Sequence, residues 1–263
     1  MIALVLGGDV AAMVATYAIT ISDHNGGCRA IVPSFDGTVS LMCPVTNDLV
    51  PAGIPALGKA AEPRKVYLQP SGQAEDWADK VGRPDRIAEH FPHNGATEFF
   101  AHLSRDLFNS LAPGFASFIG PWQMDRQALG DIVNAMHPDV IINTLPRQLL
   151  CEKPDDHGFP RQQVWVSHLV GPQITDNQVL VNAEDAPAWY TASKFDGHLV
   201  TKWLGQKPPF NSIQEDSVPI STNCDCAPFG MVHVGAEARC NPVLTLADVY
   251  SDTVGAVMAG ASV

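Results

Sequence analysis

The chain opens with Met1-Ile-Ala-Leu-Val-Leu-Gly7-Gly8-Asp9-Val-Ala-Ala12-Met-Val-Ala-Thr16, and this stretch decides the fold class. Ile2 to Leu6 is wholly apolar, as expected of a strand that is buried on both faces of a parallel sheet. Gly7 and Gly8 then predict a tight turn, and Val10 to Tyr17 predicts the start of a helix. A strand, a glycine turn and a helix together present unpaired backbone N–H groups and a positive helix end to a phosphate.

The glycine spacing of dinucleotide-binding folds is G-x-G-x-x-G/A. Here the three positions are Gly7, Asp9 and Ala12, so the first and third match and the second does not. The middle glycine normally lets a pyrophosphate approach the backbone, whereas Asp9 places a carboxylate there. The stretch alone therefore fits either a nucleotide site or an ordinary strand-to-helix turn.

The composition indicates a globular protein with a large core. Hydrophobic residues make up 46% and charged residues 17% of the 263 residues, which suffices for one large domain or a domain with an inserted lobe. The net charge of −12 provides no general attraction to nucleic acid or to an anionic membrane. The sequence has neither a membrane-length apolar stretch nor a basic leader, so we expect a cytoplasmic protein with reduced cysteines.

A second strand is predicted to end at Asp23, because Ile19 and Ile21 alternate with polar residues. An acidic residue at the end of this strand binds the ribose hydroxyls in dinucleotide folds, which makes Asp23 a candidate. The segment Asp23-His-Asn-Gly-Gly27 fits a turn equally well, since Asn-Gly is a strong hairpin signal.

The remaining periodicities predict a mixed α/β chain. Helices are expected over Thr97–Phe108 and Gln127–Met136, and a buried strand over Val140–Ile142 should lie beside the first strand. Further short strands are expected, mostly in an antiparallel layer, at residues 163–170, 178–182, 197–203 and 231–235. A last helix begins at about Leu246, with Thr245 as its N-cap.

Four separated segments together resemble the superfamily of FAD-dependent amine oxidases and UDP-galactopyranose mutases. They are Leu4–Ala12, Asp23–Gly27, Asp139–Pro146 and Val234–Arg239 with the nearby Val243-Leu244. Asp185–Ser193 is also similar to a mutase-type segment, with Thr191 where an arginine is common.

The resemblance implies a Rossmann-like FAD-binding parallel sheet with an inserted, mainly antiparallel substrate layer. The FAD-binding domain would comprise residues 1–50, 130–150 and 228–263, and the inserted helical and antiparallel part residues 51–129 and 151–227. FAD would lie between the N-terminal turn and the C-terminal strand–helix junction, so the two ends of the chain should meet at one edge of the sheet.

The resemblance also implies roles for individual residues. Trp189 and Lys194 would contact the substrate, and His24 and Tyr190 are the catalytic candidates. The alternative, purely structural roles are core packing for Trp189, a solvated side chain for Lys194 and, for Arg239, an ion pair with Glu237 or Asp248. The implied cofactor-binding residues are Gly7, Gly8, Ala11, Ala12, Asp23, Gly26, Gly27, Thr144, Gly235, Arg239, Val243 and Leu244.

The implied activity is that of an FAD-dependent oxidoreductase or lyase that acts on a C–N bond of an amine. The partner would be a small-molecule or nucleotide-linked substrate. One alternative is a UDP-galactopyranose mutase-like reaction on a sugar nucleotide. Another is a degenerate relative without catalysis, in which Asp9 in place of a glycine indicates that phosphate binding has been lost.

A cysteine and histidine cluster in the sequence raises the question of zinc. Cys224-Asp-Cys226, His233 and Cys240 are of the right residue types, but the C-x-C pair lacks a second tight pair. The sequence therefore favours reduced thiols, and no metal is predicted.

Overall fold

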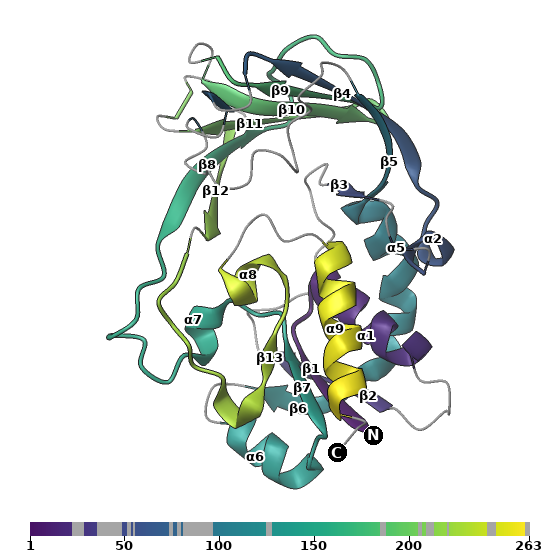
Figure 1. Cartoon of the computed structure of the whole chain (residues 1–263), viewed down its shortest axis with the longest axis vertical. Coiled ribbons are helices and arrows are strands. Elements are labelled where there is room, and N and C mark those ends of the chain that lie inside the picture. The colour runs from purple at the N-terminus through teal and green to yellow at the C-terminus, as the bar shows by residue number, and fades with distance from the viewer. Residues whose placement is uncertain are drawn as a thin grey trace.

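The fold is seen in a computed structural model of the chain (Figure 1). The residues that the structure describes are 1–22, 29–35, 49–51, 54, 56–73, 76–77, 80, 97–124, 128–184, 188–204, 207–208, 213–219, 221–240 and 246–260. None of the helices in these ranges is long and apolar enough to cross a lipid bilayer.

The first sheet has five strands, all parallel, in the order β13-β7-β1-β2-β6. β1 is central, which explains why its sequence is apolar on both faces. The strands are β1 (Ile2–Leu6), β2 (Arg29–Phe35), β6 (Ile119–Met124), β7 (Val140–Asn143) and β13 (Val232–His233).

Alternate residues of β1 face two different cores. Ala3 and Val5 pack against α1 (Val10–Ser22), α5 (Ser104–Phe115) and α9 (Leu246–Gly260). Leu4 and Leu6 pack against buried residues of α6 (Ala128–Met136). Figure 1 shows α9 lying beside α1, so the first and last helices of the chain cover the same face of this sheet.

The second sheet has eight strands in the order β12-β8-β11-β10-β9-β4-β5-β3, antiparallel except between β4 and β9. Figure 1 shows it as a curved layer beyond the carboxyl ends of the parallel strands. Its strands are β3 (Leu49–Pro51), β4 (Arg64–Ser71), β5 (Thr97–Leu103), β8 (Arg161–Ser167), β9 (Gln178–Asn182), β10 (Trp189–Phe195), β11 (His198–Leu204) and β12 (Ile213–Pro219).

Short helical segments lie between the strands. In the described residues they are three short α-helices and two 3₁₀ turns. They are α2 (Leu57–Ala60), α7 (Arg147–Leu150), α8 (Gly235–Arg239), η2 (Ala116–Phe118) and η3 (Pro228–Gly230).

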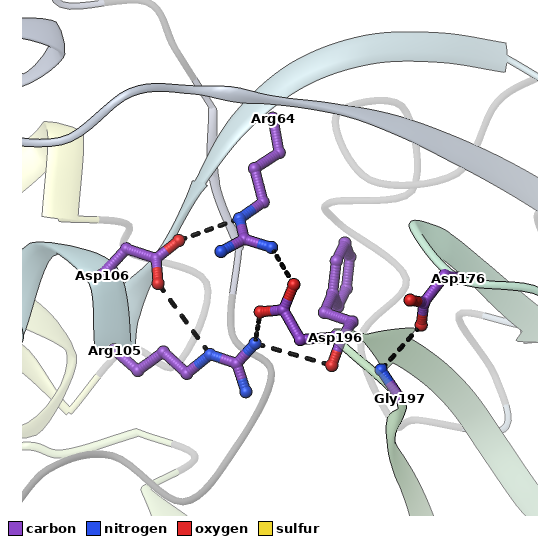
Figure 2. Close-up of polar contacts among 7 residues, drawn as sticks. Arg64, Arg105, Asp106, Asp176, Asp196 and Gly197 are labelled. Carbon is purple, nitrogen blue, oxygen red and sulfur yellow. Dashed lines mark hydrogen bonds and ion pairs between the residues drawn. The ribbon is translucent and has the colours of Figure 1, made fainter.

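An ionic network fastens the antiparallel sheet to α5 (Figure 2). Arg64, the first residue of β4, contacts Asp106 of α5 at 2.9 Å and Asp196 of the β10–β11 turn at 2.6 Å. Arg105 of α5 also pairs with Asp196. Hydrogen bonding to Arg64 holds the pKa of Asp196 below its usual value.

The predicted second strand that ends at Asp23 is wrong, because α1 continues to Ser22 and the next strand, β2, begins only at Arg29. Three residues of α1 are fully buried: Ala15, Ala18 and Ile19. The tertiary packing of this helix therefore outweighs the strand-like alternation of Ile19 and Ile21.

The predicted helix over Thr97–Phe108 is also wrong in its first half. Thr97–Leu103 forms β5, which pairs with β4, and α5 starts at Ser104. Phe100 is 58% exposed whereas Ala101 and Leu103 are fully buried. Aromatic residues also suit a strand, and pairing with β4 decides between the two periods.

The predicted α/β fold class is confirmed, with a parallel sheet, an antiparallel layer and a helix at Ala128–Met136. The boundaries of the two parts differ from the expectation in more than one segment. β6 lies within residues 51–129 but belongs to the parallel sheet, and α5, from the same range, packs against α1.

Candidate functional site

Three segments that are far apart in the sequence end at the same edge of the parallel sheet. β1, β7 and β13 are neighbours, with Leu6 opposite Asn143 and His233 opposite Asn143. Backbone hydrogen bonds continue past the strands, from Thr144 N to Leu6 O at 2.9 Å and from Val234 N to Asn143 O at 2.9 Å. Ligands of open α/β sheets bind at this carboxyl edge.

Position 7 requires a glycine because the end of β1, the start of α1 and the residue after β7 lie very close together at this edge. Its φ is +149°, and an ideal Cβ on Gly7 would lie 2.0 Å from Thr144 Oγ1 and 3.1 Å from Ala12 Cβ. The first and third positions of the glycine pattern therefore fit the structure, since a small Ala12 lets α1 pack against the end of β1.

Gly235 brings the C-terminal part of the chain to the same place. It has φ +83° and is the first residue of α8. An ideal Cβ there would lie 3.2 Å from Val249 Cγ2 of α9 and 3.6 Å from Ala11 Cβ of α1. The predicted meeting of the two ends of the chain is confirmed, while the cofactor roles of Gly7, Gly8, Ala11, Ala12 and Gly235 stay predictions.

Asp9 caps α1. Its carbonyl accepts a hydrogen bond from Met13 N at 3.1 Å, and its carboxylate accepts one from Ala12 N at 2.9 Å. The carboxylate thus uses a backbone donor that an anion at a helix N-terminus would otherwise bind.

The electrostatic state of Asp9 reflects two opposing effects. The residue keeps an exposed surface, yet the protein around its carboxylate desolvates it, and this raises the pKa of Asp9. Hydrogen bonds from Ala12 and Thr144 oppose that rise, and the negative charge of Glu237 adds to it.

Thr144 is buried, and its hydroxyl lies 3.1 Å from Leu6 O and 3.2 Å from Asp9 Oδ1. These contacts make Thr144 a support for the turn after β1. Its predicted contact with a cofactor stays a prediction.

The side chains of Asn143 and His233 are hydrogen-bonded to each other, a pairing that was not predicted from the sequence. Asn143 is fully buried at the end of β7, and its Nδ2 donates to His233 Nδ1 at 2.9 Å. His233 Nε2 in turn donates to Cys226 O at 2.8 Å, so the two bonds require a neutral ring protonated on Nε2. Desolvation lowers the pKa of His233, in agreement with that form. An asparagine directly after a buried strand was the available signal.

Arg239 is exposed and its guanidinium contacts Asp252 Oδ2 of α9 at 2.7 Å. Arg239 therefore forms an ion pair with Asp252, whereas the expected alternative named Glu237 or Asp248 as the partner. Glu237 instead accepts two hydrogen bonds from Arg161, at 2.8 and 3.0 Å.

The three predicted substrate and catalytic residues that the structure describes, Trp189, Tyr190 and Lys194, all lie on β10 of the antiparallel sheet. The Trp189 carbonyl accepts hydrogen bonds from Asn182 Nδ2 at 2.9 Å and Lys80 Nζ at 3.0 Å. Tyr190 packs against a core of valines in the same sheet. These contacts hold Trp189 and Tyr190 within the antiparallel sheet.

Several other predicted site residues lie outside the described residues: His24, Asp23, Gly26, Gly27, Val243 and Leu244. The reason for choosing Asp23 no longer holds, because it follows a helix rather than a strand. The acidic residue that follows β2 in the sequence is Asp36, which also lies outside the described residues.

The cysteines group differently from the sequence expectation. Cys224 and Cys226 meet Cys151 and His157. His233 is held by Asn143 and Cys226 O, and Cys240 Sγ lies 3.7 Å from Glu237 O, so neither belongs to this group.

No protein-family model matches the chain, and no curated protein does. Solved structures do match in fold. MibH, described as a tryptophan 5-halogenase, superposes with a TM-score of 0.57 at 10% identity, over 98% of this chain and 66% of MibH. A flavoprotein/dehydrogenase from Cytophaga hutchinsonii gives 0.57 at 11% identity, over 99% of this chain and 78% of its own.

BrvH, described as a flavin-dependent halogenase from Brevundimonas sp. BAL3, gives a TM-score of 0.51 at 9% identity, over 96% of this chain and 70% of BrvH. The chain thus spans about two thirds of the length of the two halogenases. At such identities the similarity concerns the fold, and the chain has the Rossmann-like α/β fold of these flavoproteins.

Proposed function

We propose that the chain binds FAD at the carboxyl edge of its parallel sheet and is an FAD-dependent oxidoreductase. The observation that carries this proposal is the convergence of two glycines on the start of α1, where Gly7 lies against Ala12 and Gly235 lies against Ala11, so that both ends of the chain meet there. The fold likeness to proteins described as a flavoprotein and a flavin-dependent halogenase supports a flavin over other dinucleotides.

In this proposal the backbone N–H groups from Gly8 to Ala11 would hold the pyrophosphate at the positive end of α1, because the N–H of Ala12 is bonded to Asp9. The start of α8 at Gly235 faces the flavin, and the antiparallel sheet beyond the carboxyl edge carries the substrate side (Figure 1). Bound FAD supplies the redox chemistry, and the protein orients the substrate and excludes competing reactions.

The reaction that the proposed oxidoreductase catalyses is a separate, more specific prediction. The resemblance of the sequence favours oxidation of an amine at its C–N bond, with a mutase-like reaction on a sugar nucleotide as the alternative. Peroxide formed from an amine and oxygen supports the first reaction, and isomerisation of a sugar nucleotide without net oxidation supports the second. A halide-dependent product from tryptophan would instead place the chemistry with MibH and BrvH.

The position of Asp9 favours a second candidate function, in which the chain is a relative of flavoproteins that has lost phosphate binding. Its carboxylate already accepts the hydrogen bond from Ala12 N and adds negative charge where a pyrophosphate would lie. In that case the fold persists without a cofactor and the protein has no flavin chemistry.

The deciding experiment titrates FAD into the purified full chain and into its Asp9→Asn and Asp9→Gly variants. FAD binding by the unchanged chain, with flavin absorbance that remains after gel filtration, supports the oxidoreductase. Binding by the variants alone supports the relative that has lost phosphate binding, and binding by none of the three overturns the proposal.

Asp176→Asn is the matched control. Asp176 also accepts a backbone hydrogen bond, from Gly197 N at 2.9 Å, but it lies in a turn of the antiparallel sheet (Figure 2). FAD affinity should be unchanged in this variant. An equal effect of the two Asp-to-Asn changes would mean that net charge, rather than the position of Asp9, is responsible.

A further inference from the structure

Four side chains from two separate loops meet beside the parallel sheet. Cys151 and His157 lie in the loop after α7, and Cys224 and Cys226 lie in the segment before η3. Their ligand atoms all lie within 4.8 Å of one another. We propose that Cys151, His157, Cys224 and Cys226 bind one structural Zn²⁺.

The spacing of these atoms matches a tetrahedral zinc site. Bonds of about 2.3 Å to sulfur and about 2.0 Å to nitrogen place two sulfurs about 3.8 Å apart, and a sulfur and a nitrogen about 3.5 Å apart. Cys151 Sγ lies 3.5 Å from Cys224 Sγ and 3.9 Å from Cys226 Sγ. His157 Nδ1 lies 3.1 Å from Cys151 Sγ and 3.7 Å from Cys226 Sγ.

The ligand set selects the metal and its role. Three thiolates and one imidazole are typical of structural zinc, because such soft and borderline ligands suit Zn²⁺ better than Mg²⁺ or Ca²⁺. The sulfur separations are far longer than the S–S bond of a disulfide. Four protein ligands leave no open position for water or substrate, so the site is structural rather than catalytic.

Backbone hydrogen bonds orient the two cysteines that join the loops. The N–H of Glu152 donates to Cys226 and the N–H of Lys153 donates to Cys151. Donors around the sulfurs of a metal site hold the ligands in position and offset the negative charge of the thiolates. Cys151 and Cys224 are buried, and Cys226 and His157 are half-buried, so the site is shielded from solvent.

The loops are already held together without the metal. Gly158 N donates to Asn223 Oδ1 at 2.7 Å, and Thr222 Oγ1 donates to Gly158 O at 2.9 Å. Both loops consist of turns and irregular backbone, and Cys151 and Cys224 are 73 residues apart in the sequence. A metal there would add a cross-link between two irregular connections that hydrogen bonds already hold side by side.

The proposed zinc site is connected to the carboxyl edge of the parallel sheet. Cys226 O accepts a hydrogen bond from His233, which is bonded to Asn143 at the end of β7. Zinc would therefore stabilise the position of β13 and of the start of α8. This consequence holds whether or not the chain binds FAD.

The test measures metal in the full chain, produced without an affinity tag that binds metal and with zinc in the medium. We expect one Zn²⁺ per chain by mass spectrometry of the elements, and loss of that zinc in Cys224→Ser and His157→Ala. Cys240→Ser is the matched control, because Cys240 is buried nearby but outside the cluster, and it should retain the zinc.

A second measurement does not depend on the folding of a variant. Co²⁺ added to the reduced, metal-free protein should give the thiolate-to-cobalt charge-transfer absorption and the visible bands of a tetrahedral site, and Zn²⁺ should abolish both. A chain that takes up neither metal overturns the proposal. Stoichiometric iron in place of zinc, or zinc kept by both ligand variants, would overturn it as well.

Discussion

The hydroxyl of Thr144 occupies the space that a side chain on Gly7 would need, with only 2.0 Å between Oγ1 and an ideal Cβ. Gly7 follows the central strand and Thr144 follows the neighbouring one, so this contact lies directly beyond the paired ends of two parallel strands. The same edge receives Gly235 from the C-terminal part of the chain, and the proposed cofactor site depends on these contacts.

Gly7→Ala should destabilise the fold, because the new Cβ meets Thr144 Oγ1 and Ala12 Cβ and because φ is positive. We expect a loss of about 1–3 kcal/mol in the free energy of unfolding, measured by urea denaturation. The Thr144→Ala background should reduce the cost of Gly7→Ala by about 1 kcal/mol, since it removes the nearest atom.

Gly58→Ala in α2 is the control for Gly7, because nothing lies within 4 Å of its added Cβ. It should leave stability unchanged or raise it slightly. Equal costs at the two glycines would contradict the steric account of Gly7.

Gly235→Ala should cost about 1 kcal/mol or more, chiefly because a residue with a Cβ is strained at φ +83°. Val249→Ala removes the 3.2 Å contact but leaves the backbone strain, so the double variant should recover only part of the loss. Thermal unfolding of the unchanged chain, the two single variants and the double variant measures these differences in stability.

The comparison for Gly235 is Gly255→Ala in α9, where the added Cβ meets nothing within 4 Å. This change should stabilise the helix, because alanine has the higher helix propensity. A cost at Gly255 similar to that at Gly235 would mean that the positive φ is not the cause.

The raised pKa of Asp9 predicts a stability that falls with rising pH. A carboxyl whose pKa is higher in the folded state stabilises that state fully below its unfolded pKa of about 3.9, and this contribution is lost as the pH rises through the folded value. Asp9→Asn keeps the helix cap but does not titrate. The free energy of unfolding of the unchanged chain should therefore decline relative to Asp9→Asn as the pH rises through that window and then level off.

Urea denaturation at several pH values gives this difference. The same titration should show FAD affinity increasing toward acid pH in the unchanged chain and not in Asp9→Asn. A constant difference in stability from about pH 4 to neutrality would show that Asp9 titrates normally.

Asp196→Asn should weaken the network that joins β4, α5 and the β10–β11 turn (Figure 2). We expect about 1 kcal/mol or less, because Asp196 is half exposed and solvent screens its pairs. The lowered pKa of Asp196 means that its contribution is present above the unfolded pKa of about 3.9 and is lost as the pH falls through the folded value.

Chemical denaturation at neutral and acid pH, with and without added salt, checks the network. Salt should reduce the difference between the unchanged chain and Asp196→Asn. A difference that survives both high salt and full protonation would point to packing rather than to charge.

Local sequence patterns were sufficient to predict the elements whose conformation is set by burial of apolar residues. The apolar run Ile2–Leu6, the glycine turn after it and the buried strand at Val140 predict neighbouring parallel strands, because only burial on both faces explains such runs. That the two ends of the chain meet was implied by the resemblance to the amine oxidase and mutase superfamily, and the contacts of Gly235 with Ala11 and Val249 confirm it.

Tertiary contacts decided the features that local patterns left ambiguous. Ile19 and Ile21 alternate like a strand, yet packing extends α1 through them, and Phe99 and Phe100 suit either period until β5 pairs with β4. The role of Asp9 also follows from the fold, because only the structure shows its carboxylate bonded to Ala12 N and Thr144.

The fold class could be predicted from the sequence, since the spacing of apolar residues and glycines indicates the buried strands β1 and β7 and the turn that follows β1. Which polar side chains share a site depends instead on the folded chain. Cys151 and Cys224 are 73 residues apart in the chain and 3.5 Å apart in space, and no local pattern encodes a distance set by the folding of everything between them.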